Sequence, residues 1–399
     1  MKLEFGDDVE AFRAEFRDWL ERNRPTAEEM AADPALSTAH VPGWAREWTG
    51  RMFRDGWLVP GWPPERGGRS AGPVETLVYL ETLIEEGVPR TTNPQGLGIV
   101  VPSILDYGSP EQIERWAMPV LRGERSACLG MSEPDAGSDL AALSTRAILD
   151  GDHFVVNGQK VWTSGANYAD FCFLFCRTDP DAPKHKGISI LLVDMDTPGI
   201  TVRPLPEIVH PEHPDLNEVF FADVVVPADQ LVGELNHGWA MANGSLAHER
   251  GMVWLDGVLR LEAAMRDALD DARRLLPRLR GSERGAATDR VVDSYVDTVA
   301  ARCLGYRGFA KLVRGGSAPE QALMKAFCTE SEQRLASVLA ELHADGGLDR
   351  TPAGEGGAMM SFDGTWTERY FRSFGGTISA GTSEIQRNII AERVLGLPR

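Results

Sequence analysis

A β-rich section between two helical sections is the sequence feature that most constrains the fold. From Asp8 to about Asn23, apolar residues recur at three- and four-residue steps, which predicts an amphipathic helix. Ser109-Pro110-Glu111 places a cap and a first-turn proline ahead of another helix. After about residue 126, β-branched and aromatic runs alternate with turn residues, at 153–156, 160–162, 171–176, 188–193 and 219–226.

Helical periodicity returns from about Trp239. It predicts helices over 291–313 and 320–343 and a terminal helix from near Ser383, with exposed loops at 278–287 and 350–357. Within the β-rich section, Asn157-Gly158 predicts a hairpin turn. A chain of 399 residues is expected to form two or three domains. We predict domains at residues 1–125, 126–236 and 237–399.

Composition excludes several classes of function. A net charge of −18 disfavours a nucleic-acid or anionic-membrane surface, because such binding needs clustered Lys and Arg. Five cysteines form no disulfide framework, and neither a signal peptide nor a run of 18 apolar residues is present, so we expect a cytoplasmic protein that spans no membrane. Motifs of serine hydrolases, zinc proteases, P-loop proteins and Rossmann proteins are absent, and no metal site is predicted.

Three separated segments carry candidate chemistry. In residues 129–139, Pro134 and Gly137 shape a loop whose N–H groups and hydroxyls, those of Ser132 and Ser138, suit a flavin edge or a phosphate. Residues 157–166 end in Trp162, which suits a planar ring, and Ser164, which suits a ring nitrogen. Taken singly, each segment also fits a plain loop or a core tryptophan.

The third segment covers residues 377–388. Gly381, Thr382 and Ser383 precede an apolar helix, and a capped helix N-terminus with free N–H groups binds anions such as pyrophosphate. An ordinary helix cap is the alternative interpretation.

Together and in this order, the three segments resemble the acyl-CoA dehydrogenase family. Residues 220–227, 232–236, 238–239 and 391–399 add to the resemblance, which runs from roughly residue 60 to the C-terminus. The family implies a mostly α fold with a middle β domain: an N-terminal helical domain, a β-barrel-like middle domain and a C-terminal four-helix bundle. It also implies FAD, held between domains and across a subunit contact.

The resemblance assigns roles by motif position. FAD contacts are expected from Leu129, Met131, Ser132, Gly137, Ser138, Trp162, Thr163, Ser164, Thr382, Ser383 and Glu384. Acyl-CoA contacts are expected from Ser138, Arg250, Ala380 and Gly381. The family further implies α,β-desaturation of an acyl-CoA in lipid metabolism, an electron-transfer flavoprotein as acceptor, and a homodimer or homotetramer.

The reaction needs a carboxylate that removes the α-proton while the flavin takes the β-hydride. Much of the family has a Glu directly before the Gly-Thr of the third segment, but this chain has Ala380. A subset typified by isovaleryl-CoA dehydrogenase places the base on a helix ahead of an arginine. The corresponding pair here is Glu249-Arg250, so Glu249 is predicted as the base, with a plain ion-paired helical Glu as the alternative. His248 is expected to line a pocket or the helix surface.

Two stretches depart from the family pattern. Residues 273–282 and 341–348 stand where many members contact FAD of the neighbouring subunit, and neither matches cleanly. One alternative is therefore kept: the chain is a subunit that works only with a different dehydrogenase chain. Two further alternatives are a flavin monooxygenase or oxidase on the same fold and a subunit without activity.

Overall fold

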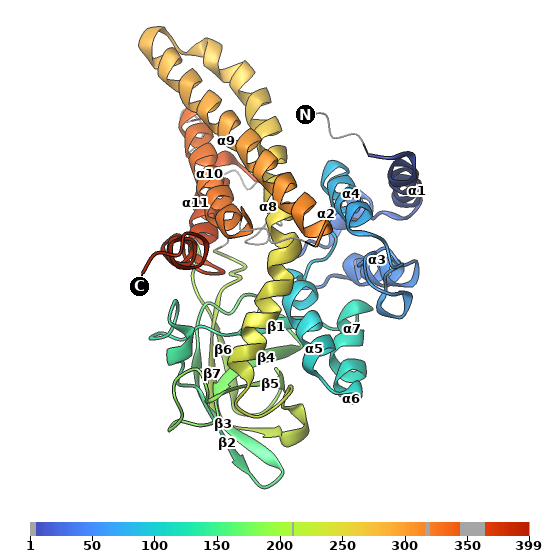
Figure 1. Ribbon diagram of the computed structural model, residues 1–399, viewed down its shortest axis with the longest axis vertical. Coiled ribbons are helices and arrows are strands. Elements are labelled where there is room, and N and C mark those ends of the chain that lie inside the picture. Colours follow the sequence, from blue (N-terminus) through green and yellow to red (C-terminus); the bar gives the residue numbers. More distant parts are fainter. Residues whose placement is uncertain (1–4, 210, 316–319, 344–363, 399) are drawn as a thin grey trace. The chain divides into compact units, whose positions relative to one another are not determined.

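The computed structural model describes residues 5–209, 211–315, 320–343 and 364–398, and in 242–256 and 320–322 it describes the backbone only. The chain forms two compact units, residues 1–79 with 88–249 and residues 80–87 with 250–399. Figure 1 shows the elements of both units. Among the described helices, none is long and apolar enough to cross a membrane.

The first unit opens with helices. They are α1 (Asp7–Asn23), α2 (Ala27–Ala32), α3 (Gly43–Arg54), η1 (Pro64–Arg66), α4 (Pro73–Glu85), η2 (Gly96–Val100), α5 (Val101–Tyr107), α6 (Pro110–Gln112), η3 (Ile113–Ala117) and α7 (Met118–Leu121). Their core is aromatic: the ring of Phe16 lies 4.6 Å from that of Trp57 and 4.7 Å from that of Tyr79. The predicted helix starts near Asp8 and at Pro110 are confirmed, the second with Ser109 as its cap.

A seven-stranded sheet follows, in the order β1-β4-β2-β3-β7-β6 with β5 beside β4. The strands are β1 (Ala127–Gly130), β2 (Arg146–Asp150), β3 (His153–Lys160), β4 (Phe171–Arg177), β5 (Ile188–Asp194), β6 (Ile200–Pro204) and β7 (Asn217–Pro227). The sheet curls around buried residues such as Phe154, Cys172, Leu191 and Val224 and forms the barrel-like middle domain. The whole sheet belongs to the first unit, so the ends of β1 and β3 lie in the same unit.

The prediction of a hairpin turn at Asn157-Gly158 was wrong. β3 runs through both residues, and the register against β7 shifts between Val156 and Gly158. The Asn157 amide exchanges hydrogen bonds of 3.0 Å with the side chain and N–H of Asp223 on β7. Asn-Gly therefore makes a β-bulge, because a third strand pairs with β3 at this point. The separate strand predicted for 160–162 is not formed: Lys160 is the last residue of β3, and Val161 and Trp162 follow the strand.

The C-terminal helices α8 (Gly238–Leu275), α9 (Gly281–Val313), α10 (Glu320–Leu342) and α11 (Trp366–Ile378) form a four-helix bundle, and α8 belongs to the second unit from residue 250 onward. Short elements complete it: η6 (Leu276–Arg278), α12 (Ser383–Ile389) and η7 (Ile390–Val394). Ion pairs link neighbouring helices, for example Arg302 with Glu262 at 3.3 Å and Arg334 with Asp297 at 2.7 Å.

The loop predicted at 278–287 was also wrong. Gly281, with φ of +55°, is the first residue of α9. The helix therefore begins about ten residues before the predicted start at residue 291. Its first turns are exposed, so their polar composition reflects solvent contact rather than a loop. The loop predicted at 350–357 lies outside the described residues.

Candidate functional site

The first candidate segment is the loop that leaves β1. Gly130 ends the strand, and a Cβ there would lie 2.8 Å from the Cys172 sulfur, so only glycine lets β1 approach β4 this closely. Glu133 and Ala136 exchange backbone hydrogen bonds of 3.0 and 3.1 Å, which closes a tight turn over Pro134 and Asp135. Leu129, Met131 and Ser132 are half-buried, whereas Gly137 and Ser138 are exposed. Gly137 does not adopt a positive φ, so the backbone freedom expected of it is not used.

A buried ion pair holds this loop on the end of β3. Lys160 is fully buried, and its Nζ donates to Glu133 Oε1 at 2.8 Å and to the Met131 carbonyl at 2.9 Å. Glu133 also accepts from the N–H groups of Ser144 at 2.6 Å and Thr145 at 2.8 Å. Burial alone would raise the pKa of Glu133, but the Lys160 ammonium and these donors lower that pKa to about 2.

Sequence reasoning assigned no role to Glu133 and Lys160, although both lie inside the quoted segments. The available signal was a lysine in an apolar strand, because lysines are almost never fully buried without a partner. The pair connects the loop after β1 with the segment that contains Trp162. The Val161 N–H adds a 2.9 Å bond to the Ser132 carbonyl.

Trp162 has an unusual backbone and an open side chain. Its φ is +60°, a left-handed conformation that a bulky residue rarely adopts, and its side chain is 60% exposed. Such strain persists only where the surroundings impose it, and it often marks a functional site. The next residue, Thr163, is buried, and no described residue is a hydrogen-bond partner of its Oγ1.

Neighbouring elements fix the backbone of this segment. The Thr163 N–H donates to the Asn217 carbonyl at 3.0 Å, and the Asn217 amide returns a 3.1 Å bond to the Thr163 carbonyl. Gln95 Nε2 donates to the Ser164 carbonyl at 3.3 Å. These hydrogen bonds fix the backbone of Thr163 and Ser164, directly after Trp162.

These observations fit the isoalloxazine of FAD. An exposed indole offers a flat apolar surface for a planar ring, and the unsatisfied Thr163 hydroxyl offers a hydrogen bond to a polar edge. The residues of the first unit that would hold the ring are Trp162, Thr163, Ser164 and the loop after β1. That loop is already shaped by the Glu133–Lys160 pair.

The third candidate segment lies in the second unit. Ala380 and Gly381 are both left-handed, with φ of +52° and +86°. Lys325 Nζ donates to the Gly381 carbonyl at 2.7 Å, and Gln386 Nε2 donates to the Ala380 carbonyl at 3.2 Å. Within the described part of the chain, no group accepts the Ala380 N–H.

The residues after this turn begin α12. Thr382 caps the helix by accepting from the Ile385 N–H at 3.2 Å, as predicted for a helix start. Ser383 is buried, and its Oγ has no hydrogen-bond partner among the residues described. Glu384 is exposed, and hydrogen bonds to its own N–H and to Thr382 lower its pKa. The unsatisfied Ser383 hydroxyl fits a polar ligand, as the predicted FAD contact requires.

The predicted base and its neighbour lie on α8. The structure places Glu249 and Arg250 within this helix, but their side chains are outside the described residues, as is that of His248. Among described carboxyls, Glu332 on α10 is notable, because burial raises its pKa to about 7 while Arg260 and Arg369 oppose that rise. A carboxyl with such a pKa is a second candidate for proton transfer.

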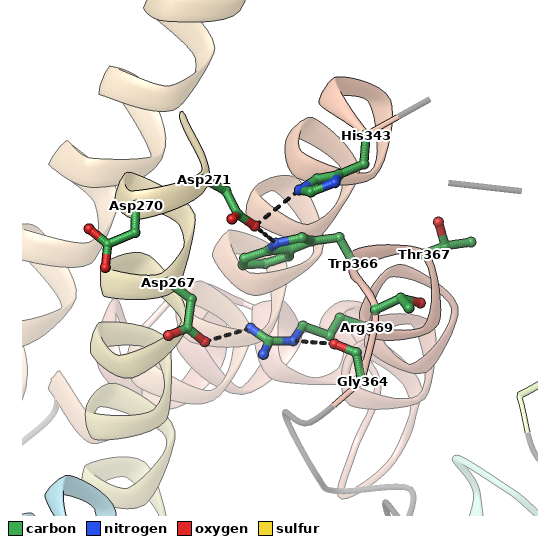
Figure 2. A pocket seen from close by; sticks show the side chains of 9 residues that line it. Asp267, Asp270, Asp271, His343, Gly364, Trp366, Thr367 and Arg369 are labelled. Atoms are coloured by element: carbon green, nitrogen blue, oxygen red, sulfur yellow. Dashed lines mark hydrogen bonds and ion pairs between the residues drawn. The ribbon is translucent and has the colours of Figure 1, made fainter. Parts of the chain in front are cut away.

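His343, from the second stretch that departs from the family pattern, lines a pocket of about 460 Å³ in the second unit, together with Asp270 and Asp271, which lie just ahead of the first stretch on α8. Figure 2 shows His343 and Trp366 directed at one carboxylate, that of Asp271. Asp271 Oδ2 accepts from His343 Nε2 at 3.0 Å and from Trp366 Nε1 at 2.6 Å. Burial would raise the pKa of Asp271, but these donors and Arg274 lower it.

Three arginines pair with the aspartates that line this pocket. Arg273 pairs with Asp270 at 2.5 Å, and Arg274 pairs with Asp271. A third pair, between Arg369 and Asp267 at 3.0 Å, closes the pocket wall (Figure 2). Each of these arginines thus faces a carboxylate from α8.

Family models match successive sections of the chain. The N-terminal domain of acyl-CoA dehydrogenases matches residues 6–124, the middle domain residues 128–224 and the C-terminal domain residues 236–395. The chain belongs to the acyl-CoA dehydrogenase family, whose members are oxidoreductases. The predicted family and fold class are confirmed.

Relatives extend over the whole length of the chain. A Mycobacterium tuberculosis protein named acyl-CoA dehydrogenase IpdE1 is 34% identical, and the match covers 98% of each chain. A solved structure described as the Tcur3481-Tcur3483 steroid ACAD has 30% identity and a TM-score of 0.82, with full coverage of both chains. The ChsE4-ChsE5 complex from Mycobacterium tuberculosis has 28% identity and a TM-score of 0.79, also with full coverage.

Proposed function

We propose that this chain is an FAD-dependent acyl-CoA dehydrogenase that desaturates the α,β bond of an acyl-CoA with Glu249 as base. The observation that carries the proposal is the Trp162 segment. A strained, exposed indole lies beside a buried hydroxyl that has no hydrogen-bond partner among the described residues, next to the loop that the Glu133–Lys160 pair holds. Family membership supplies the matching chemistry. Bound FAD would accept the β-hydride.

The residues of this chain have separate roles in the proposal. Trp162 and Ser164 orient the ring, while Ser138 and Arg250 contact the acyl-CoA. The N–H of Ala380 donates to the thioester oxygen and stabilises the charge that develops there as the α-proton leaves. Because Ala380 is left-handed and its N–H has no acceptor within the described chain, this donor needs no rearrangement.

Glu249→Gln tests the base. The variant keeps side-chain size and loses basicity, so FAD should stay bound while flavin reduction by acyl-CoA, followed as absorbance bleaching, falls by at least about a thousandfold. Glu332→Gln is the matched control, since it removes a buried carboxyl of the same bundle. Bleaching that survives in Glu249→Gln and is lost in Glu332→Gln would transfer the assignment to Glu332.

We also propose a branched or bulky acyl group as substrate. A base on an internal helix leaves the position of Ala380 without a carboxylate, and one similar structure is described as a steroid ACAD. A panel of short, linear, branched and steroid acyl-CoA thioesters measures this directly. Flavin reduction should be fastest with the branched or polycyclic members, and a preference for linear short chains would contradict the proposal.

The Asp271 pocket favours a second candidate, a subunit that works with a different dehydrogenase chain. The first stretch that would face a neighbour's FAD provides Arg273 and Arg274, which already pair with Asp270 and Asp271, and carboxylates repel a pyrophosphate. One similar structure is itself a complex of two named chains. The purified chain alone should then bind clearly less than one FAD per chain, as counted by absorbance after gel filtration. Full occupancy in a homo-oligomer would exclude this candidate.

A further inference from the structure

Asp215 is a buried carboxylate that binds only neutral groups. It is 2% exposed and lies just before β7 begins at Asn217. Its Oδ1 accepts from the Ser37 hydroxyl at 2.8 Å, the Thr38 N–H at 2.6 Å and the Thr38 hydroxyl at 2.8 Å. Within the described chain it forms no ion pair. Burying a charge costs free energy unless donors replace the lost water, so the residues around Asp215 are arranged to supply donors.

The Thr38 hydroxyl is the middle member of a chain of hydrogen bonds. A hydroxyl has one proton to donate. Both carboxylate oxygens of Asp215 lie near it, at 2.8 and 3.0 Å, so the proton is directed at the carboxylate. The free lone pairs of the hydroxyl then accept from Gln95 Nε2 at 2.9 Å. The direction of these bonds is therefore fixed: Gln95 donates to Thr38, and Thr38 donates to Asp215.

Gln95 extends this chain to the segment after Trp162. Its Nε2 also donates to the Ser164 carbonyl at 3.3 Å. A carbonyl only accepts, and the proton of the Thr38 hydroxyl is already directed at Asp215. Both neighbours of the Gln95 amide therefore require its nitrogen rather than its oxygen. The orientation of this amide is determined by the buried carboxylate two hydrogen bonds away.

The main chain of Asp215 holds the same segment from another side. Its carbonyl accepts from the Gly165 N–H at 2.7 Å and from Asn217 Nδ2 at 2.8 Å. The carboxylate thus acts on Ser164 through side chains, while the carbonyl binds the next residue directly. All these residues belong to the first unit.

We propose that Asp215, Thr38 and Gln95 are positioning residues that fix the Ser164 backbone, and with it the Trp162 segment, for the planar ring. The inference rests on the proposed binding of FAD at this segment. None of the three residues needs to touch the ring. Asp215 directs the Thr38 hydroxyl, this hydroxyl orients the Gln95 amide, and the amide holds the Ser164 carbonyl. Reversing any of these bonds would place two donors or two acceptors face to face.

FAD affinity tests the role of the hydroxyl. Thr38→Val keeps the side-chain shape and removes the hydroxyl, while the N–H of residue 38 still reaches Asp215. The Kd for FAD, measured by fluorescence titration, should rise about tenfold because Gln95 loses the acceptor that orients it. Thr38→Ser restores the hydroxyl and should return the Kd to within about threefold of the unmodified value.

A matched control is available in the second unit. Thr298 is also buried, and its hydroxyl donates to the Ser294 carbonyl within α9. Thr298→Val should therefore leave the Kd for FAD unchanged. An unchanged Kd in Thr38→Val, or an equal loss of affinity in Thr38→Ser, would overturn the proposal.

A double-mutant cycle separates positioning from a purely structural role of Asp215. Asp215→Asn places an amide beside the Thr38 hydroxyl, and its N–H groups reverse the hydrogen bond between them. Because Asp215 acts through Thr38, this change should raise the Kd for FAD about tenfold in the unmodified chain and less than about threefold in Thr38→Val. Equal effects in the two backgrounds would refute the proposal. Circular dichroism melting shows which variants fold, and the Thr38 variants decide the question if Asp215→Asn does not.

Hydrogen–deuterium exchange of the full chain without cofactor tests the same bonds in the absence of flavin. Exchange in a peptide that spans Trp162 to Ala166 should be at least about threefold faster in Thr38→Val, because the segment loses a correctly oriented donor. Thr298→Val should not change it. Failure of the unmodified chain to bind FAD would contradict the proposed function, whereas unchanged exchange in Thr38→Val would contradict the positioning role.

Discussion

Lys160 is a buried cation whose acceptors lie on the loop after β1. Lys160→Met should leave the Glu133 carboxylate buried without a counter-ion and lower the free energy of unfolding by about 3 kcal/mol. Urea denaturation measures this change, and FAD affinity should fall in parallel because the loop loses its anchor.

A double variant separates the charge from the packing. Adding Glu133→Gln to Lys160→Met removes the uncompensated charge, so part of the lost stability should return. If the double variant is less stable than Lys160→Met by the full effect of Glu133→Gln alone, the two residues are not coupled.

Glu332 should make stability depend on pH. Its pKa of about 7 in the folded protein lies above the ordinary value of 4.5, so its favourable contribution is complete below pH 4.5 and is lost as pH rises through 7. A glutamine at position 332 cannot ionise, so the Glu332→Gln variant does not lose this stability as the pH rises. The variant should gain stability relative to the unmodified protein, on the order of 2 kcal/mol, between pH 5 and pH 8. Urea unfolding at both pH values measures the gain, with exposed Glu28→Gln as control; an equal difference at the two pH values would contradict it.

At the level of elements, the turn after Trp162 is held by a close approach. Gly165 has a φ of +69°, and a Cβ there would lie 2.5 Å from the Ala39 Cβ. Gly165→Ala should therefore destabilise the protein by about 3 kcal/mol, through steric conflict added to backbone strain. Gly151→Ala is matched, because Gly151 has a similar φ of +63° and open surroundings, and it should cost only about 1 kcal/mol. Equal losses in thermal or urea unfolding would mean that the Ala39 contact is unimportant.

Helix starts were predictable where local chemistry decides them. The side-chain oxygens of Ser109 and Thr382 form the predicted caps by accepting from backbone N–H groups three residues later. Asn157-Gly158 was misread because pairing with β7, more than sixty residues later, determines its conformation. β1, β2 and β6 are only four or five residues long and were not predicted, because so short a strand gives little β-branched or alternating pattern to recognise.

At the scale of the whole molecule, the order of helices, β section and helices followed from periodicity and is confirmed by the family models. The candidate segments were found through short motifs, but the contacts that shape them were not. Lys160 reaches Glu133 across 27 residues, and Asp271 meets His343 across 72. Such pairs form only when separate elements come together in the fold, and a short sequence pattern does not show which distant residues will meet.

The complete protein is predicted to be a dehydrogenase rather than an oxidase of the same fold. After reduction by acyl-CoA, it should pass electrons to an electron-transfer flavoprotein or a dye much faster than to O₂. Stopped-flow reoxidation with each acceptor measures the difference. Fast reoxidation by O₂ alone would favour the oxidase or monooxygenase alternative, and Glu249→Gln serves as the unreduced control.

The Glu133–Lys160 pair also bears on how the protein acquires its cofactor. Both partners belong to the chain, so the loop after β1 has its bonds before any flavin arrives. A preformed loop does not lose conformational freedom on binding, which favours affinity. Cofactor-free protein should therefore remain folded at this loop and accept flavin analogues by simple mixing, which makes the chain a suitable host for flavins with altered redox potential.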